Sequence, residues 1–193
     1  MQDVISIRPA RLSDIPAITR IYAHAVTHGT ASFELEPPDE AEMTRRMGAI
    51  LDGKFPYIVA EIDGKVAGYA YASFYRTRPA YRFTVENSVY VAHDMHRRGI
   101  GKVLLQKLIE ECTKRGFRQM IAVIGDSDQA ASIGVHKACG FEPAGNLRSI
   151  GWKFDKWLDT PLMQLSLGPG ASAAAPDRDA RSGDGGETGS NLH

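Results

Sequence analysis

The chain has 193 residues, which at a soft prior of roughly 150 residues per domain means one domain and a remainder. Hydrophobic residues make up 43% and charged residues 24% of the composition, as in ordinary soluble domains, which excludes collagen-like, coiled-coil and wholly disordered chains. Lysine and arginine total 23, as do aspartate and glutamate, so no net positive charge attracts nucleic acid or an anionic membrane. We expect neither as a partner.

The N-terminal residues, the cysteines and the C-terminal segment indicate the cellular compartment and the extent of the folded domain. The first residues lack a basic segment followed by an apolar run, and no stretch of 18 apolar residues occurs, so we expect a cytoplasmic protein that is neither secreted nor membrane-spanning. Cys112 and Cys139 are too few for a disulfide framework, although a single bridge stays open. Gly, Ala, Ser, Asp and Pro dominate residues 168–193, which predicts a disordered tail after a domain at residues 1–167.

The N-terminal half predicts a strand, two helices and a hairpin, in that order. The strand covers residues 4–8, and Ser13 is the expected N-cap of a helix whose apolar stripe is Ile15, Ile18, Ile21, Tyr22 and Ala25. Asp39 is the expected N-cap of the second helix, with Met43, Met47, Ile50 and Leu51 as its apolar residues. Asp63-Gly64 separates two strand-like runs, residues 57–62 and 66–74, and predicts an antiparallel pair.

The C-terminal half alternates strands with helices. A strand at residues 85–91 leads through a glycine turn into a helix that contains Leu104, Leu105, Leu108, Ile109 and Cys112 and ends at Gly116. A strand at residues 120–124, a helix at 130–139 ended by Gly140, and strands at 141–147 and 162–167 follow. Hairpins mixed with strand-helix-strand crossovers predict an α+β fold, a mixed sheet with helices on its faces.

The glycine turn predicts an anion site. A helix N-terminus presents unpaired backbone N–H groups and about half a unit of positive charge. Gly99 and Gly101 allow close backbone approach, and Arg97, Arg98 and Lys102 add positive charge. One residue separates the two glycines and no hydroxyl residue follows the lysine, so this is not a nucleoside-triphosphate loop. Taken alone, the turn is also consistent with a plain strand-to-helix connection.

Several ordered motifs carry a family resemblance. VYVAHDMHRRGIGKVLLQKLIEEC, residues 89–112, resembles the acetyl-CoA pyrophosphate motif of the GNAT N-acetyltransferases. TVENSVYV before it, AVIG and AASIGVHKACGF after it, and GWKFDKWLDTPLMQL near the end resemble the phosphinothricin and methionine sulfoximine acetyltransferase branch. The resemblance covers residues 5–167 almost without gaps. It implies a single-domain GNAT fold with a mostly antiparallel twisted sheet, acetyl-CoA as co-substrate, no metal, and a homodimer with residues 151–159 at its interface.

The resemblance also implies which residues bind acetyl-CoA. The set comprises Val89, Tyr90, Val91, Arg97, Arg98, Gly99, Ile100, Gly101, Lys102 and Gln129. The chain departs from the family pattern at two places. His96 stands where the superfamily usually has Gln or Arg, and Gln129 stands where the family commonly has Asn against the pantetheine arm.

Acetylation of an amine requires a base, because an amine with a pKa near 10 is mostly protonated at pH 7. Glu86 is a carboxylate in an otherwise apolar strand and matches the proposed base of the resembled family, acting directly or through water. The alternative is a solvated strand residue. Alternation places Glu86 on one face with Ser88 and Tyr90, unless a bulge, which the superfamily has in this strand, changes the count.

His136 and Val91 complete the predicted chemistry. His136 occupies the position at which many relatives have a tyrosine that protonates the CoA thiolate. With an unperturbed pKa near 6.5, it can donate that proton or help to deprotonate the amine; the alternative is a histidine that only bonds a neighbour. By resemblance, the Val91 N–H binds the oxyanion. Direct transfer needs no thiol, so we expect both cysteines to be small buried apolar residues.

The acceptor site is predicted from residues 75–82, which hold three guanidinium groups and two phenol rings. Guanidinium groups suit a carboxylate or phosphinate, so Arg76, Tyr81 and Arg82 are candidate substrate contacts; the alternative is a solvated basic loop. Phe33 matches the family's loop over the acceptor pocket, and residues 152–154 are expected to cover it from the other side.

The resemblance, together with these residues, implies a detoxifying enzyme. It would transfer the acetyl group of acetyl-CoA directly to the α-amine of phosphinothricin, methionine sulfoximine or methionine sulfone, and so confer antibiotic or herbicide resistance. One rival is a GNAT enzyme that acetylates another amine, such as a polyamine or a peptide N-terminus. Another is a non-catalytic acyl-CoA-binding sensor, which would keep the glycine turn but have no need of Glu86 and His136.

Overall fold

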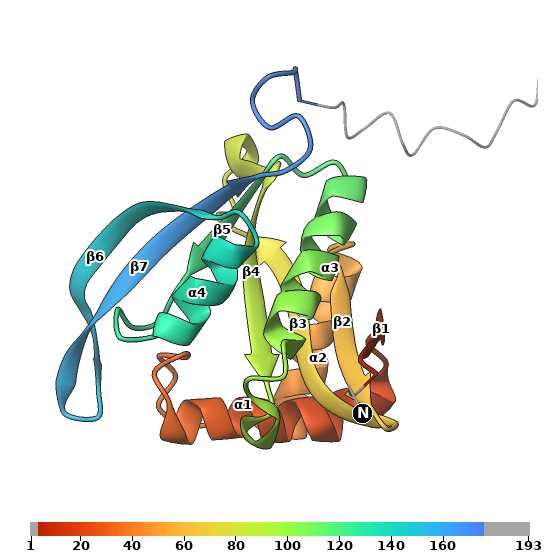
Figure 1. Ribbon diagram of the computed structural model, residues 1–193, viewed down its shortest axis with the longest axis vertical. Coiled ribbons are helices and arrows are strands. Elements are labelled where there is room, and N and C mark those ends of the chain that lie inside the picture. The colour runs from red at the N-terminus through yellow and green to blue at the C-terminus, as the bar shows by residue number, and fades with distance from the viewer. Residues whose placement is uncertain (1–3, 176–193) are drawn as a thin grey trace, which may run out of the picture.

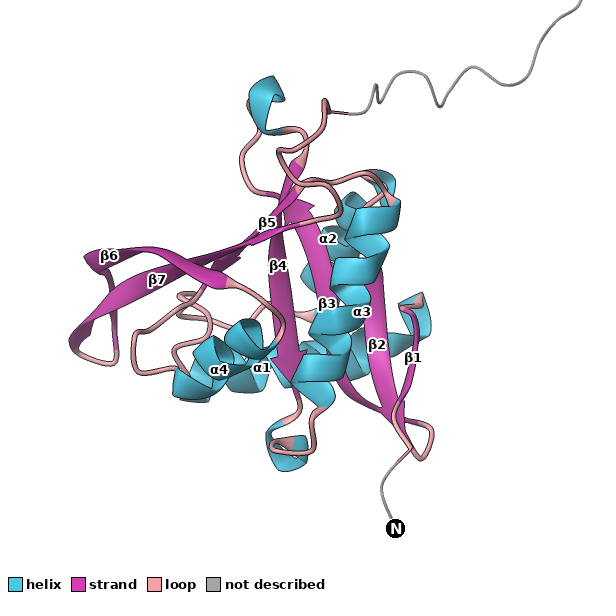
Figure 2. Ribbon diagram, turned by 45° about the horizontal axis from the view of Figure 1, so that its top comes forward, coloured by secondary structure: helices cyan, strands magenta, loops and turns pink. Residues whose placement is uncertain are grey.

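The computed structural model describes residues 4–175, which form one seven-stranded sheet with two helices on each face (Figures 1 and 2). The strand order is β1-β2-β3-β4-β5-β7-β6; β4 and β5 are parallel and the other neighbours antiparallel. The predicted α+β class and the predicted order of elements are confirmed. The strands are β1 (Ser6–Pro9), β2 (Tyr57–Ile62), β3 (Lys65–Phe74), β4 (Thr84–Val91), β5 (Gln119–Val123), β6 (Glu142–Lys153) and β7 (Lys156–Ser166); the helices are α1 (Ile15–His28), α2 (Glu40–Asp52), α3 (Ile100–Lys114) and α4 (Ala130–Ala138).

The N-cap of helix α1 lies one residue later than predicted. Ser13 lies inside a short 3₁₀ turn, and the N-cap is Asp14, whose side chain does not cap the helix. The Asp14 carboxylate instead accepts hydrogen bonds from the Arg8 guanidinium and the Arg11 backbone N–H. This ion pair ties the start of α1 to β1. The buried stripe of the helix contains the predicted isoleucines and Tyr22, with Val26 in place of Ala25.

Helix α2 and the β2–β3 hairpin follow their sequence signals closely. The Asp39 carboxylate accepts the backbone N–H of Glu42 at 2.8 Å, as expected of an N-cap. Met43 and Met47 are buried, but Leu51 is 40% exposed, so the apolar face of α2 ends before it. Asp63 and Gly64 both have positive φ angles, as a two-residue hairpin turn requires.

Helix α3 packs unusually close to the sheet. A Cβ at Gly68 of β3 would lie 2.8 Å from the Tyr90 carbonyl oxygen and 3.1 Å from the Leu104 side chain. Leu104, Leu105, Leu108 and Cys112 are fully buried against the strands. The helix ends where predicted, because Gly116 adopts the left-handed conformation that closes a helix C-terminus. This packing fixes the position of the glycine turn at the other end of α3.

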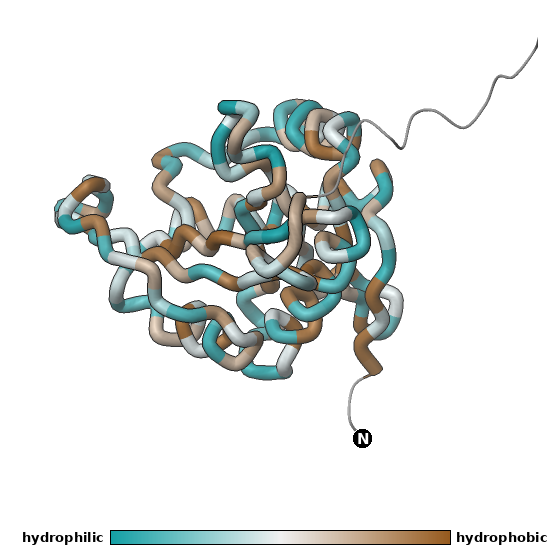
Figure 3. The backbone as a smooth tube through the Cα atoms, turned by 90° about the horizontal axis from the view of Figure 1, so that it is seen from above, coloured by the Kyte–Doolittle hydropathy of each residue, from teal (hydrophilic) through white to brown (hydrophobic). Residues whose placement is uncertain are grey.

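The β6–β7 hairpin is longer than predicted. Its strands extend over residues 142–153 and 156–166 and project beyond α4, and the projecting end carries strongly hydrophobic positions (Figures 1 and 3). The turn residues Phe154 and Asp155 have φ angles of 52° and 56°. Non-glycine residues seldom adopt this conformation, so no local pattern predicts a turn there.

Residues 168–175 form turns after β7, with the Gly170 N–H donating to the Leu167 carbonyl. The predicted tail beyond them, residues 176–193, lies outside the described residues. Cys112 and Cys139 are both free, so they form no bridge with each other. In the described part of the chain, every helix is too short or too polar to cross a bilayer.

Candidate active site

The site lies where two parallel strands separate. Within the described residues, β4 and β5 pair over three positions and last at Glu86 and Ile121. Beyond that point a cavity of about 150 Å³ opens between them. Five of the predicted site residues line it, namely Glu86, Val89, Tyr90, Gln129 and His136. The cavity therefore brings together the predicted base, the predicted histidine and part of the predicted acetyl-CoA site.

The edge of β4 directs free backbone groups into this gap. Ala92 donates its N–H to the Ala67 carbonyl at 2.9 Å, so residues at even positions of β4 bond to β3. Odd positions, including Val89 and Val91, then direct their N–H groups toward the side from which β5 has diverged. A ring nitrogen of His96 lies 3.2 Å from the Val91 carbonyl oxygen. The N–H groups are donors suited to an oxyanion.

Glu86 faces the opposite side of the sheet from His136. The β3–β4 pairing runs without a register shift, so the simple alternation count holds and Glu86 shares its face with Ser88 and Tyr90. Burial raises the pKa of Glu86, and the nearby Arg76 guanidinium opposes that shift. A carboxylate with a raised pKa is a better proton acceptor, as a general base requires.

His136 is held by two oxygen atoms. The residue is 5% exposed; Nδ1 lies 2.8 Å from the Ser132 carbonyl oxygen and Nε2 lies 3.0 Å from Oδ1 of Asn87. The Asn87 amide donates in turn to the Ile121 carbonyl at 3.1 Å and so joins β4 to β5 where their ladder ends. Burial lowers the pKa of His136, and the Ser132 contact opposes that change. A lowered pKa favours the neutral ring, which carries one N–H and donates to one of these two oxygen atoms at a time.

Sequence reasoning missed Asn87. A signal was present, because alternation along β4 places Asn87 on the buried face with Val85 and Val89. A buried polar side chain needs a hydrogen-bond partner, and here it has two, Ile121 and His136.

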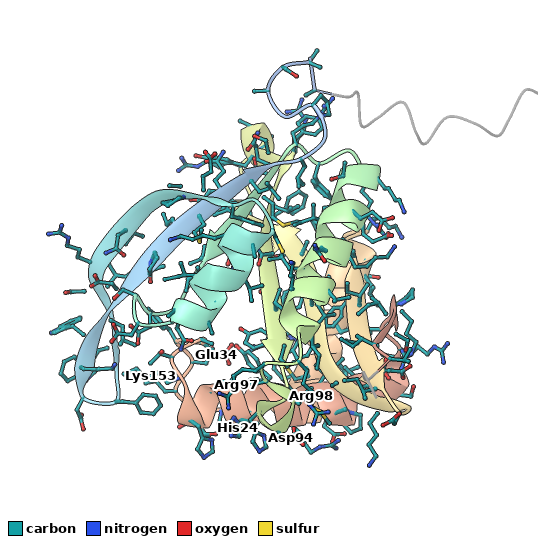
Figure 4. All side chains as sticks on the ribbon, in the orientation of Figure 1. His24, Glu34, Asp94, Arg97, Arg98 and Lys153 are labelled. Atoms are coloured by element: carbon teal, nitrogen blue, oxygen red, sulfur yellow. The ribbon has the colours of Figure 1, made fainter. Side chains whose placement is uncertain are left out.

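The glycine turn has the geometry of an anion cradle. Gly99 is the N-cap of α3 with a φ of 80°, and no side chain caps the helix. A Cβ at Gly99 would meet nothing within 4 Å, and one at Gly101 would meet only Val91, at 3.6 Å. Arg97 and Arg98 are exposed on the turn (Figure 4), whereas the Ile100 side chain is buried in the core, which leaves its backbone for binding. These residues fit the pyrophosphate of acetyl-CoA.

The loop between α1 and α2 forms one wall of the cavity. We call residues 30–34 the acceptor loop; its Ala31 lines the cavity with Glu86. Gln129 lines it too, but its amide donates to the Thr30 hydroxyl at 2.9 Å. A Cβ at Gly125 would lie 2.1 Å from the Thr30 carbonyl oxygen. The segment between β5 and α4 is therefore in direct contact with the acceptor loop.

The β6–β7 hairpin contacts the same loop. A Cβ at Gly151 would lie 2.3 Å from the Phe33 ring, so the ring packs on the glycine backbone. The expectation that residues 152–154 cover the pocket needs correction. Trp152 and Phe154 are 53% and 52% exposed, and the inward residue between them is Lys153, which is 4% exposed. Side chains alternate along a strand, so an inward Lys153 places both aromatic rings outside.

The predicted acceptor contacts from residues 75–82 lie outside the cavity lining. Arg76, Tyr81 and Arg82 are exposed. The Arg76 guanidinium lies 4.7 Å from the centre of the Tyr75 ring, and the Tyr81 ring packs edge-on against the same ring. The structure therefore does not bring these three residues into the cavity, although Arg76 still influences Glu86.

A metal ion and a cysteine thiol are two other kinds of catalytic group. Among residues 4–175, no three His, Cys, Asp or Glu side chains are arranged to hold a metal ion. Burial raises the pKa of Cys112 to about 12 and also raises that of Cys139. Both thiols are thus protonated at neutral pH, which does not suit a nucleophile.

Comparisons with known proteins agree with this geometry. Residues 18–141 match the model of the acetyltransferase (GNAT) family. The chain is 54% identical over 165 residues to a phosphinothricin N-acetyltransferase of Alcaligenes faecalis, covering 86% of this chain and 84% of the relative. It is 42% identical to a methionine sulfoximine and methionine sulfone acetyltransferase of Pseudomonas paraeruginosa, covering 87% and 98%.

A solved structure is also similar. It is a GNAT superfamily phosphinothricin acetyltransferase from Sinorhizobium meliloti in complex with acetyl-CoA, with a TM-score of 0.88 and 45% identity. The match covers 92% of this chain and 95% of that one. Sequence motifs, fold and relatives agree, and the chain belongs to the acetyltransferase (GNAT) family.

Proposed function

We propose that this acetyl-CoA-dependent N-acetyltransferase acetylates the α-amine of a small amino-acid analogue, namely phosphinothricin, methionine sulfoximine or methionine sulfone, and so detoxifies it. The observation that carries the proposal is the cavity between β4 and β5, where Glu86 and His136 reach one space from opposite faces of the sheet. The substrates follow from the relatives, which are named for these compounds. Such an activity confers resistance to phosphinothricin-type herbicides or antibiotics.

The reaction is a direct transfer. The neutral amine attacks the thioester carbonyl carbon, the carbon–sulfur bond breaks, and one amine proton leaves for Glu86, directly or through water. Val91 donates its backbone N–H to the carbonyl oxygen as negative charge develops there. Val89, Tyr90 and the turn from Arg97 to Lys102 bind acetyl-CoA. No metal takes part.

His136 assists the proton transfers. A neutral ring can help to remove the amine proton, and a protonated ring can protonate the departing thiolate. Burial and the contacts to Ser132 and Asn87 hold the ring in a fixed orientation. Phe33 covers the acceptor, while the exposed Arg76 and Arg82 guanidinium groups form a positively charged surface that attracts an anionic acceptor toward Glu86.

Release of CoA with a panel of acceptors tests the proposal. The panel contains acetyl-CoA with phosphinothricin, methionine sulfoximine, methionine sulfone, glutamate, spermidine or a short peptide. Turnover with the first three alone supports the proposal. Turnover with spermidine or the peptide instead would keep the mechanism and replace the substrate, and acetyl-CoA binding without turnover would indicate a sensor.

We also propose a cytoplasmic homodimer. Free cysteines suit a reducing compartment. The β6–β7 hairpin exposes large apolar side chains that a second copy would cover; they are Leu147, Ile150, Trp152, Phe154 and Trp157. Light scattering should give twice the chain mass, and Trp157→Arg should shift the particle toward the monomer; a monomeric wild type would refute the dimer.

A further inference from the structure

Lys153 is a buried cation outside the cavity lining. It is 4% exposed, whereas Lys156 on the same hairpin has a side chain that is 50% exposed. Removing an ammonium group from water is costly unless a partner compensates. Burial accordingly lowers the pKa of Lys153, and the charge of Glu34 opposes that shift. A lysine retained at this cost calls for a role.

The Lys153 ammonium group lies 5.1 Å from the centre of the Phe154 ring, and its hydrogen-bond partner is the backbone of the acceptor loop. Its Nζ donates to the Ser32 carbonyl oxygen at 2.7 Å, across 121 residues of sequence. Two positions earlier on the same face of β6, Gly151 supports the Phe33 ring. The hairpin therefore contacts two consecutive residues of the loop, one through a charge-assisted hydrogen bond and the other through close packing. Figure 4 shows Lys153 and Glu34 beside the same loop.

The rest of the loop is fixed from the other side. The Tyr22 hydroxyl lies 2.9 Å from the Ser32 hydroxyl and donates to Glu34 at 2.9 Å. Arg46 of α2 donates to Glu34 at 2.6 Å. The side chains of Ser32 and Glu34 thus form hydrogen bonds with residues of α1 and α2, while the Ser32 carbonyl and the Phe33 ring face the hairpin. Without the hairpin contacts, Phe33 keeps its flanking anchors but loses its own support.

We propose that Lys153 is a positioning residue for the amine acceptor. It holds the Ser32 carbonyl so that Phe33 rests on Gly151 and the acceptor loop closes its end of the cavity. The β6–β7 hairpin thereby sets the affinity for the amine, whereas the β4–α3 turn sets that for acetyl-CoA. This inference rests on the proposed function, because it takes the amine to bind beside Ala31 and Glu86.

The test separates the two substrates kinetically. Lys153→Met removes the charge but keeps most of the side-chain volume, and we expect the KM for the acceptor to rise about tenfold because a displaced loop no longer covers the bound amine. The kcat and the KM for acetyl-CoA should stay within about twofold, because the substitution alters neither the catalytic side chains nor the glycine turn. Lys153→Arg, which can still donate to Ser32, should recover part of the affinity. Lys65→Met, at an exposed lysine of β3 that does not line the cavity, is the matched control and should leave the acceptor KM unchanged.

A second readout does not depend on the acceptor. Amide hydrogen exchange of residues 30–34 should become faster in Lys153→Met, and that of residues 97–103 should not. Gly151→Ala, which pushes Phe33 away without altering the lysine, should raise the acceptor KM in the same direction. If wild type acetylates none of the tested amines, the proposed function fails. The exchange measurement still tests whether Lys153 holds the acceptor loop. Unchanged exchange at residues 30–34, or an equal rise in KM for both substrates, would overturn the inference.

Discussion

The two ends of the site are built in different ways. Apart from Gln129, the predicted acetyl-CoA end is local, because β4, the glycine turn and the start of α3 follow one another within residues 84–102. The acceptor end is assembled from distant segments, whose contacts join Gln129 to Thr30 across 99 residues and Lys153 to Ser32 across 121. One end depends on backbone N–H groups and the other on side-chain packing.

This difference indicates which end of the site determines specificity for the amine. Backbone donors at a helix N-terminus bind phosphate whatever the neighbouring side chains are, which suits a co-substrate that never changes. A wall made from three separate segments can change shape with single substitutions, which suits a variable amine. Substitutions at each end should therefore alter the KM of one substrate. Only residues where the two ends meet, such as Glu86, should alter the chemical step itself.

The largest effect is expected where the two ends meet, in Glu86→Gln. Loss of the general base should lower kcat by about 10²- to 10⁴-fold, while the dissociation constant for acetyl-CoA stays unchanged. Rapid-quench kinetics with titration calorimetry measure both quantities. Because burial raises the pKa of Glu86, ionising it costs stability as pH rises through its folded pKa, so the variant should not melt at a lower temperature at pH 8. Full activity in Glu86→Gln would remove the assigned base.

His136 comes next, with an activity effect and a stability effect. His136→Gln should lower kcat by about a hundredfold through loss of proton transfer. Burial holds the folded pKa of His136 below its ordinary value, so the unfolded chain binds the proton first and wild type should lose stability as pH falls below about 6.5. The difference in melting temperature between variant and wild type, followed from pH 7.5 to 5.5, should therefore move in favour of the variant. A difference that is constant across this range contradicts the assignment.

Gly99→Val tests the local end alone. Gly99 has a φ of 80°, which a β-branched residue adopts only with strain, so the turn should shift. We expect the KM for acetyl-CoA to rise about tenfold and the KM for the amine to change less than about twofold. Gly48→Val is a control for the glycine loss, because a Cβ at Gly48 meets nothing and this residue lies in α2 away from the cavity.

Gly125→Ala tests the distributed end. The added Cβ would collide with the Thr30 carbonyl, so the acceptor loop must move outward. The KM for the amine should rise severalfold, and binding of acetyl-CoA, measured by calorimetry, should be affected less. The opposite pattern would show that the two ends are not separate.

The smallest effect is expected at Arg76, which lies outside the cavity. Its positive charge opposes the rise in the pKa of Glu86, so Arg76→Ala should move the acidic limb of kcat/KM slightly toward higher pH. The pH profile of kcat/KM measures this shift. In wild type, high salt should weaken the effect of the Arg76 charge on Glu86, because salt screens exposed charges. A shift toward lower pH would show that Arg76 acts in another way.

Local signals in the sequence predicted most of the fold. Asp39, the Asp63-Gly64 pair and Gly116 each define a boundary through their own backbone chemistry, and all three boundaries are confirmed. Ser13 misled because the competing Asp14 is engaged by Arg8, a tertiary contact that no local pattern reveals. The Phe154–Asp155 turn lacks glycine, so the hairpin was predicted too short.

Local motifs likewise predicted the central residues of the site but not the contacts between distant segments. Glu86, His136 and the turn lie in continuous motifs, and the cavity brings both side chains together. Lys153 and Gly151 were not identified, because their importance depends on Ser32 and Phe33, more than a hundred residues earlier. Sequence spacing cannot express such a contact.

A crystal structure with CoA and the N-acetylated product would show directly where both substrates bind. We expect the pyrophosphate at the backbone of Gly99 and Gly101, the pantetheine arm between β4 and β5, and the acetyl oxygen near the Val91 N–H. We also expect the amide nitrogen of the product beside Glu86, under Phe33. Product bound elsewhere, with Glu86 and His136 facing only solvent, would contradict these expectations.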